Sequence, residues 1–139
     1  MTQSDQQPDN LPDSSERYRQ GWQILARLNQ PAAEQLIESL QEIAPDLSRF
    51  VVEFPFGDIY SRPGLDPQSR SLITIASLTT LGHAQPQLKA HIHGALNLGC
   101  TREQVVEVIL QMAVYAGFPA ALNGMLTAKA AFAERDADP

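Results

Sequence analysis

Residues 66–82 decide the fold class, and they read D-P-Q-S-R-S-L-I-T-I-A-S-L-T-T-L-G. Asp66 suits a helix N-cap, and Pro67 fits the first helical position because an amide hydrogen has no partner there. Gly82 suits the end of the helix. The apolar residues between these signals cover more than one face of a helix. We therefore predict a central helix that packs on several sides.

The chain on both sides of this segment also carries helix signals. Proline stands at the expected first turn of three more helices, and Thr101 to Gln104 matches a capping box. No segment alternates apolar and polar residues between hairpin turns, as strands would. Besides 66–82, helices are predicted over 14–29, 31–44, 46–54, 86–99, 105–116 and 119–132. The sequence thus predicts an all-α domain of about six or seven helices.

Length and composition fit a single domain. The chain has 139 residues, enough for one core and few for two. We expect the domain to cover residues 14–133, after a disordered polar leader at 1–13 and before a flexible tail at 134–139. The helices at 66–82 and 105–116 are apolar on most sides, and a small domain cannot easily bury both. The surplus apolar surface favours a homo-oligomer over a monomer.

Charge and cysteine content argue against several classes of function. The net charge is −6, whereas nucleic-acid binding needs clustered Lys and Arg. No apolar run reaches the roughly 18 residues that cross a membrane, and the N-terminus lacks the pattern of a secretory signal. The single cysteine, Cys100, rules out an intramolecular disulfide and a Cys-x-x-Cys redox motif. We expect a cytoplasmic protein that binds neither nucleic acid nor membrane.

Residues 54–66 interrupt the helical pattern. They read F-P-F-G-D-I-Y-S-R-P-G-L-D, with aromatic residues, helix breakers, an acid and an arginine in one short segment. Such a mixture is typical of a pocket wall. Asp58 and Arg62 also stand at i, i+4 spacing, so the segment could instead be a turn closed by their ion pair. The local sequence leaves both interpretations open.

The segment L-K-A-H-I-H-G-A-L at 88–96 contains two of the three histidines. His91 lies at the edge of the apolar stripe, where partial burial could tune it as an acid or base. It could equally be a hydrogen-bonded structural residue. His93 falls in a row with Lys89 and Asn97 and is predicted to face solvent. The two histidines lie on different faces of the helix without metal-ligand spacing, so we predict no metal site.

Three blocks of the sequence occur in a distinctive order. They are F-G-D-I-Y-S-R-P-G-L-D with R-S-L-I-T-I-A at 56–66 and 70–76, L-K-A-H-I-H-G-A-L-N-L-G at 88–99, and V-Y-A-G-F-P-A-A-L-N at 114–123. Together they resemble the carboxymuconolactone decarboxylase family, over roughly residues 17–133. The resemblance implies the all-helical alkylhydroperoxidase D-like fold, assembled as a trimer or a hexamer.

The superfamily contains a peroxidase branch and a decarboxylase branch. The peroxidase motif Cys-x-x-Cys-x-x-x-His would place its histidine at His91 and its cysteines where this chain has Ala84 and Gln87. Thiol peroxidase chemistry needs an attacking and a resolving cysteine, so the resemblance favours the decarboxylase branch. We expect Cys100 to be a small apolar core residue. A redox role for Cys100 between subunits is the alternative.

The decarboxylase branch removes CO2 from 4-carboxymuconolactone and forms 3-oxoadipate enol-lactone, in the protocatechuate branch of aromatic catabolism. The reaction needs no cofactor, because the electrons of the broken bond can delocalise through the ring alkene into the lactone carbonyl. The site must bind a dianionic substrate, stabilise the developing oxyanion and supply a proton. The resemblance therefore implies a cofactor-free carboxy-lyase with a small carboxylated substrate.

The same resemblance implies roles for individual residues. Arg62 would hold a substrate carboxylate, and His91 would stabilise the enolate oxygen or protonate the carbanion. Asp58 or Glu53 would orient His91 and raise its pKa. Arg70 is either a second anchor or part of a structural ion pair. The apolar walls of the pocket are expected from Phe56, Tyr60, Tyr115 and Phe118.

The chain also departs from the pattern of the family. His93 stands where arginine is usual, and 83–87 lacks the usual charged run. Tyr60 and Phe118 stand where tryptophan is common. These departures leave three functions open: the pathway reaction, a reaction of another small lactone or cyclic acid, and binding of such a ligand without turnover.

Overall fold

The computed structural model describes residues 15–138, and all regular secondary structure in this range is helical. In chain order the elements are α1 (Glu16–Leu40), α2 (Pro45–Val51), the π-helix η1 (Val52–Ile59), α3 (Pro67–Leu81), α4 (Gln85–Asn97), α5 (Arg102–Ala116) and α6 (Phe118–Ala137). The predicted all-α fold with six or seven helices is confirmed. The leader predicted at 1–13 lies outside the described residues.

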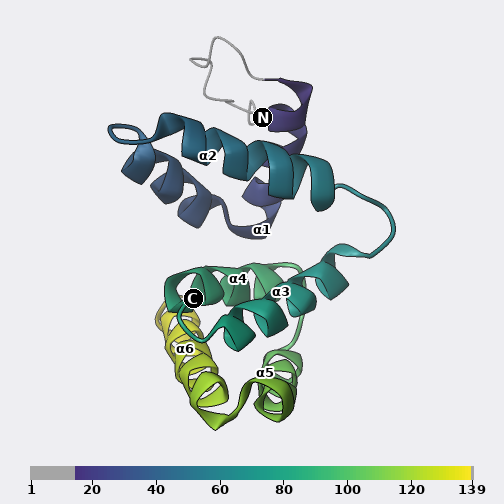
Figure 1. Ribbon diagram of the computed structural model, residues 1–139, viewed down its shortest axis with the longest axis vertical. Coiled ribbons are helices and arrows are strands. Elements are labelled where there is room, and N and C mark those ends of the chain that lie inside the picture. Colours follow the sequence, from purple (N-terminus) through teal and green to yellow (C-terminus); the bar gives the residue numbers. More distant parts are fainter. Residues whose placement is uncertain (1–14, 139) are drawn as a thin grey trace.

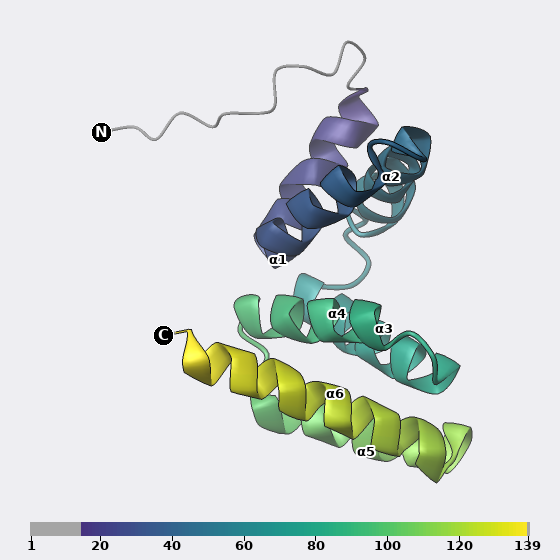
Figure 2. The ribbon, with the colours of Figure 1, turned by 90° about the vertical axis from the view of Figure 1, so that its left-hand side faces the viewer.

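The helices form two groups (Figures 1 and 2). One group consists of α1 packed against α2 and η1, and the other is the bundle of α3, α4, α5 and α6. Within the bundle, α3 and α4 lie between the α1–η1 group and the α5–α6 pair. Because α4 contacts both α1 and α6, it connects the two groups.

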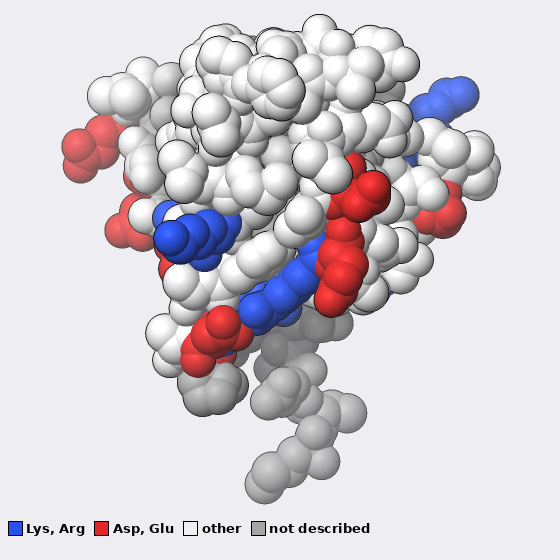
Figure 3. Space-filling model, turned by 90° about the horizontal axis from the view of Figure 1, so that it is seen from below, with Lys and Arg blue, Asp and Glu red and all other residues white. Residues whose placement is uncertain are grey.

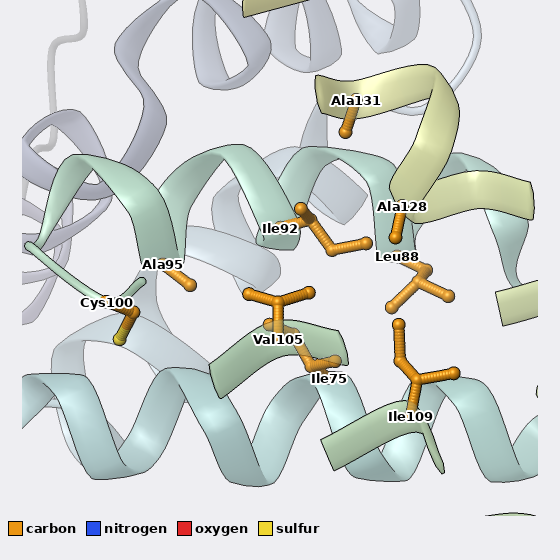
Figure 4. Close-up of a cluster of buried hydrophobic side chains, with 9 residues drawn as sticks. All are labelled: Ile75, Leu88, Ile92, Ala95, Cys100, Val105, Ile109, Ala128 and Ala131. Atoms are coloured by element: carbon orange, nitrogen blue, oxygen red, sulfur yellow. The ribbon is translucent and has the colours of Figure 1, made fainter. Parts of the chain in front are cut away.

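Each group has its own buried core. In the bundle, apolar side chains of α3, α4 and α5 point toward one another (Figure 4). The largest of them are Ile75, Leu88, Ile92, Val105 and Ile109. The smaller core between α1 and η1 includes Tyr18, Leu25, Leu28, Val52 and Phe56. Full burial of a side chain of this size contributes about 1.5–3 kcal/mol, so both groups have a strong hydrophobic basis.

A kink in α1 replaces the boundary that the sequence predicts between 14–29 and 31–44. Asn29 has non-helical backbone angles (φ −161°, ψ 81°), two residues before Pro31. Its side chain stabilises the kink, because Oδ1 accepts from the Ala32 amide at 3.3 Å and Nδ2 donates to the Ala90 carbonyl at 3.0 Å. The second arm of α1 is thereby held against α4.

The segment predicted to interrupt the helices is helical in its first half. Instead of ending at residue 54, the chain continues from α2 into η1 through Ile59. The Tyr60 amide donates to the carbonyl of Pro55 at 2.8 Å, which closes a wide turn of the π type. Pro55 itself lacks an amide hydrogen and cannot donate the usual helical bond, so a widened turn is favourable here. Only the remainder, 60–66, connects η1 to α3.

The backbones of α1 and η1 touch directly where they cross. A Cβ atom built on Gly21 would lie 2.0 Å from the Val52 carbonyl oxygen, and one built on Gly57 would lie 2.4 Å from that of Arg17. No side chain fits at either distance. The two glycines therefore set the distance between α1 and η1.

The C-terminal end of the domain differs from the prediction of a flexible tail at 134–139. Helix α6 continues to Ala137, and its last turns are tied to the bundle. Glu134 accepts from Lys89 and His93 of α4, each at 2.7 Å, and Asp136 pairs with Arg102 of α5 at 2.6 Å. These contacts with residues distant in sequence stabilise the last turns of α6, beyond the end of its apolar pattern.

The outer face of the α5–α6 pair is strongly apolar. Seen from below, the molecule presents a broad area without charged side chains, with acidic and basic residues along its rim (Figure 3). Large exposed apolar residues of these two helices are Leu110, Val114, Tyr115, Phe118, Leu122 and Leu126. No helix within residues 15–138 is long and apolar enough to cross a membrane.

We expect Gly57→Ala to lower the free energy of unfolding by about 2–4 kcal/mol, because the new methyl group forces α1 and η1 apart. Gly64→Ala is the matched control, since nothing lies within 4 Å of its Cβ position. Urea denaturation of both variants measures the difference. Equal stability of the two variants would show that the helices do not depend on this close contact.

Candidate active site

The candidate site begins where η1 meets α4. The ring of Phe56, which is buried, lies 4.9 Å from the ring of Tyr60 and 6.4 Å from that of His91, measured between centroids. The Phe56 and His91 rings are nearly parallel, with 8° between their planes. The structure therefore brings together three of the residues that the sequence singled out, from two different elements.

The first turns of α3 form the next side of the site. The hydroxyl groups of Tyr60 and Thr74 are hydrogen-bonded, and Thr74 Oγ1 donates to the Arg70 carbonyl at 2.9 Å. Because the Thr74 proton is used in that way, Tyr60 is the donor in their shared bond. The sequence did not single out Thr74, although its position one turn after Arg70 is a signal that could have been used.

The guanidinium of Arg70 has unused hydrogen-bonding capacity. Its Nη2 donates to the carbonyl of Arg62 at 2.9 Å, whereas Nε is buried and has no partner among the described residues. No carboxylate of residues 15–138 forms an ion pair with Arg70, so the alternative of a structural ion pair is not observed in this range. A planar, fork-shaped donor with an unsatisfied N–H is suited to a ligand carboxylate.

His91 is an uncharged acid–base group in this arrangement. Burial lowers its pKa from the ordinary value of 6.5, because the charged form loses its hydration. Its Nδ1 is buried and has no hydrogen-bond partner within residues 15–138. A buried polar atom without a partner costs free energy, and it marks a place where a ligand could supply the missing bond.

The predicted carboxylate partners of His91 lie elsewhere. Both oxygens of Asp58 accept from Arg17, at 2.7 and 3.0 Å, and this pairing lowers the pKa of Asp58. Glu53 lies 3.5 Å from Arg17 and 3.4 Å from Arg49. The prediction that either acid orients His91 and raises its pKa is therefore wrong for this structure, as is the Asp58–Arg62 pair. Both acids instead hold η1 to neighbouring helical segments.

Arg62 lies in the connection between η1 and α3. Its carbonyl receives the bond from Arg70, while its own side chain is exposed and forms no ion pair with residues 15–138. The structure thus leaves its guanidinium available, without bringing it into contact with His91.

Tyr115 and Phe118 do not line the site within one chain. They flank the turn between α5 and α6 and are 79% and 75% exposed. The α3–α4 layer separates that turn from η1 (Figures 1 and 2). The expectation that they form walls around His91 fails for a single chain, because the block at 114–123 and η1 lie on opposite sides of α3 and α4.

Cys100 belongs to the bundle core. It is 6% exposed, and burial together with the nearby Asp66 raises the pKa of its thiol. The thiolate is the reactive form, so this environment disfavours the redox alternative. Within residues 15–138 there is no group of three or more His, Cys, Asp and Glu residues that could hold a metal ion.

The fold and the site define an all-helical protein with a buried uncharged imidazole beside an aromatic pair, and with an incompletely bonded arginine on α3. The model of the Carboxymuconolactone decarboxylase family matches residues 45–130, which include η1, Arg70 and His91. The chain belongs to the carboxymuconolactone decarboxylase family.

Three relatives illustrate the range of the family. The chain is 34% identical to the 4-carboxymuconolactone decarboxylase of Acinetobacter baylyi over 121 residues, which cover 86% of this chain and 90% of the relative. It is 34% identical over 119 residues to a 15.0 kDa protein of Paracoccus denitrificans, covering 84% and 89%. It is 36% identical over 77 residues to the nitrosuccinic acid decarboxylase of Metarhizium robertsii, covering 55% and 52%.

We expect the buried imidazole to make stability depend on pH in a defined direction. Because the pKa of His91 is lowered by folding, the unfolded chain binds more protons just below pH 6.5. Above that pH His91 is uncharged in both states and does not reduce the free energy of unfolding. As the pH falls from 6.5 through the pKa of the folded state, the free energy of unfolding decreases. Unfolding free energies measured across this range should fall less steeply for His91→Gln than for the parent. A steeper fall in His91→Gln would contradict the assignment.

Proposed function

We propose that this protein is a cofactor-free carboxy-lyase that removes CO2 from a small carboxylated lactone, with 4-carboxymuconolactone as the substrate and 3-oxoadipate enol-lactone as the product. The family assignment and the relative from Acinetobacter baylyi support this choice over most of the chain. The observation that carries the proposal is the buried nitrogen of His91, unpartnered within residues 15–138, whose ring lies parallel to that of Phe56. Phe56 contacts Tyr60, and Tyr60 is hydrogen-bonded to Thr74. Thr74 lies one turn along α3 from Arg70 with its buried Nε, which is likewise unpartnered in this range.

In the proposed reaction, Arg70 binds the carboxylate that the substrate retains. Its buried Nε then gains the acceptor that the described residues do not provide. Arg62, whose carbonyl accepts from Arg70, adds a second positive charge for a dianionic substrate. The scissile carboxylate is directed toward the aromatic rings of Phe56 and Tyr60, where its charge is poorly solvated. Departure of neutral CO2 relieves this unfavourable placement.

His91 stabilises and then protonates the anion that remains when CO2 leaves. When the carbon–carboxylate bond breaks, its electron pair moves through the ring alkene to the lactone oxygen, and an uncharged imidazole N–H can donate to that developing oxyanion. As the negative charge develops, the imidazole takes up a proton from solvent, and the imidazolium so formed passes a proton to carbon, so that the net reaction consumes one proton. A lowered pKa suits this task, because it makes the imidazolium a stronger acid.

The proposal includes a homo-oligomer, either a trimer or a hexamer, in the cytoplasm. The exposed apolar face of α5 and α6 supports an oligomer, since water-exposed patches of this kind are costly for a monomer. In such an assembly Tyr115 and Phe118 of a neighbouring subunit could approach the site that they do not reach in their own chain.

A second candidate is decarboxylation of a different small acid. The relative from Metarhizium robertsii is named for an acid that is not a lactone, although the chain spans only about half of it. In this alternative Arg70 and His91 keep their roles. Only the acceptor for the electron pair differs, so a substrate panel separates the two candidates.

We expect His91→Gln to lower kcat/KM for 4-carboxymuconolactone at least about hundredfold, mainly through kcat, because a general acid is lost. Arg70→Met should mainly raise KM, because it removes a carboxylate anchor. Lys129→Met, an exposed change on α6 away from the candidate site, is the control. Loss of the substrate's ultraviolet absorbance measures the rates.

Three outcomes would change the proposed function. Activity of the parent on other carboxylated acids alone would replace the substrate. Binding without turnover over the whole panel would replace the enzyme by a binding protein. Full activity of His91→Gln would remove His91 from the chemistry.

A further inference from the structure

A groove of about 800 Å³ lies apart from the site around His91, between the second arm of α1, the start of α4 and α6. None of Phe56, Tyr60, Arg70 and His91 lines it. Its volume falls within the range of about 300–1,000 Å³ that is usual for small-molecule sites. Much of its wall is apolar, from Pro31, Ala32, Pro86, Ala90, Leu126 and Ala130.

Polar groups converge at one place in this groove. Lys89 Nζ donates to Glu134 Oε1 and His93 Nε2 to Glu134 Oε2, each at 2.7 Å. His93 must carry its hydrogen on Nε2, because an ionised carboxylate can only accept. Lys89 and His93 are one turn apart on α4, so both project in one direction. The result is a pair of donors, fixed by one helix, that binds the two oxygens of one carboxylate.

We propose that the groove binds a small molecule with an apolar body and a carboxylate, and that this carboxylate replaces Glu134 between Lys89 and His93. Glu134 demonstrates that the two donors have the spacing of a carboxylate. The apolar wall gives the rest of the molecule a surface to cover. The proposed ligand is thus an apolar monocarboxylate. The groove that binds it is separate from the site around His91, and binding there is separate from the reaction proposed for that site.

Glu134 can leave without loosening the fold. Its side chain is 49% exposed, and the last turns of α6 have two further ties. Arg102 pairs with Asp136 at 2.6 Å, and Arg135 Nη1 donates to Asn97 Oδ1 at 3.0 Å. Release of Glu134 into solvent therefore frees the donor pair while α6 stays in place. The pairing lowers the pKa of Glu134, so it remains a charged competitor for the ligand.

The opposite wall of the groove is already in position. Asn29 fixes the kink of α1 and donates to the Ala90 carbonyl on α4 at 3.0 Å. Pro31 and Ala32, two and three residues after Asn29, line the groove from that anchored arm. Binding thus requires movement of one side chain only, which keeps the cost of ordering small.

The test uses benzoate, a flat apolar carboxylate, and benzamide, its uncharged analogue, with the full chain followed by amide NMR shifts. We expect benzoate to shift residues that line the groove and benzamide to leave them unchanged. Glu134→Gln should bind benzoate at least about fivefold more tightly, since the internal competitor is lost. Lys89→Met should bind it more weakly. A gain of affinity cannot arise from misfolding.

Asp136→Asn is the matched control. It removes the same charge from α6 two residues away and leaves the donor pair intact, so its affinity for benzoate should equal that of the parent. His91→Gln should also bind benzoate in the groove unchanged, which separates this proposal from the one on catalysis.

Several results would overturn the proposed site. Equal shifts with benzamide would show an apolar groove without carboxylate recognition. Shifts confined to the surroundings of His91 and Arg70 would assign benzoate to the candidate active site. Unchanged affinity of Glu134→Gln would mean that its carboxylate does not compete. Groove residues that are protected by self-association, and unshifted by benzoate, would assign this face to a second copy of the chain.

Discussion

The direct contact of two backbones at Gly21 and Gly57 is the constraint on which the candidate site depends. Any side chain at these positions would overlap a carbonyl oxygen of the other helix. The contact brings η1 down onto α1 and so fixes where Phe56 lies. Because the ring of Phe56 contacts that of His91 on α4, an increase in the α1–η1 distance would move Phe56 away from His91. The packing of η1 against α1 therefore determines the geometry of the candidate site.

Electrostatic pairing is organised so that His91 has no charged partner among the described residues. Asp58 and Glu53, the acids on η1, are bound by Arg17 and Arg49. The imidazole consequently experiences burial without a compensating carboxylate, and its pKa falls. Arg70 likewise lacks an acidic partner in this range. A site with unsatisfied donors is unfavourable when empty, and it is suited to an anionic ligand that satisfies them.

The fold could be predicted from the sequence because its signals are local. Asp66 with Pro67, and the capping box at Thr101, begin α3 and α5 where the structure has them. What failed depends on contacts between distant residues. The partner of Asp58 is Arg17, 41 positions away, rather than Arg62 at helical spacing. The end of α6 is extended by partners on α4 and α5. A π-helix has no simple periodic signal, so η1 could not be recognised either.

The residues expected in the candidate site show the same difference between local signals and long-range contacts. Phe56, Tyr60 and His91 could be placed together from the motifs in which they occur, since these motifs lie at η1 and on α4. Tyr115 and Phe118 could not, because motif resemblance does not say which side of the α3–α4 layer a segment occupies. Only the three-dimensional structure shows on which side of the α3–α4 layer each segment lies (Figure 2).

Helix α4 presents a different histidine to each group of helices. Residues 91 and 93 are two positions apart, which is about 200° around a helix axis. His91 accordingly meets Phe56 of η1, while His93 meets Glu134 of α6. His93 therefore lines the groove beside α6, on the side of α4 away from Phe56. The departure at position 93 that the motif resemblance implies thus falls in the groove, and not in the surroundings of His91 within the same chain.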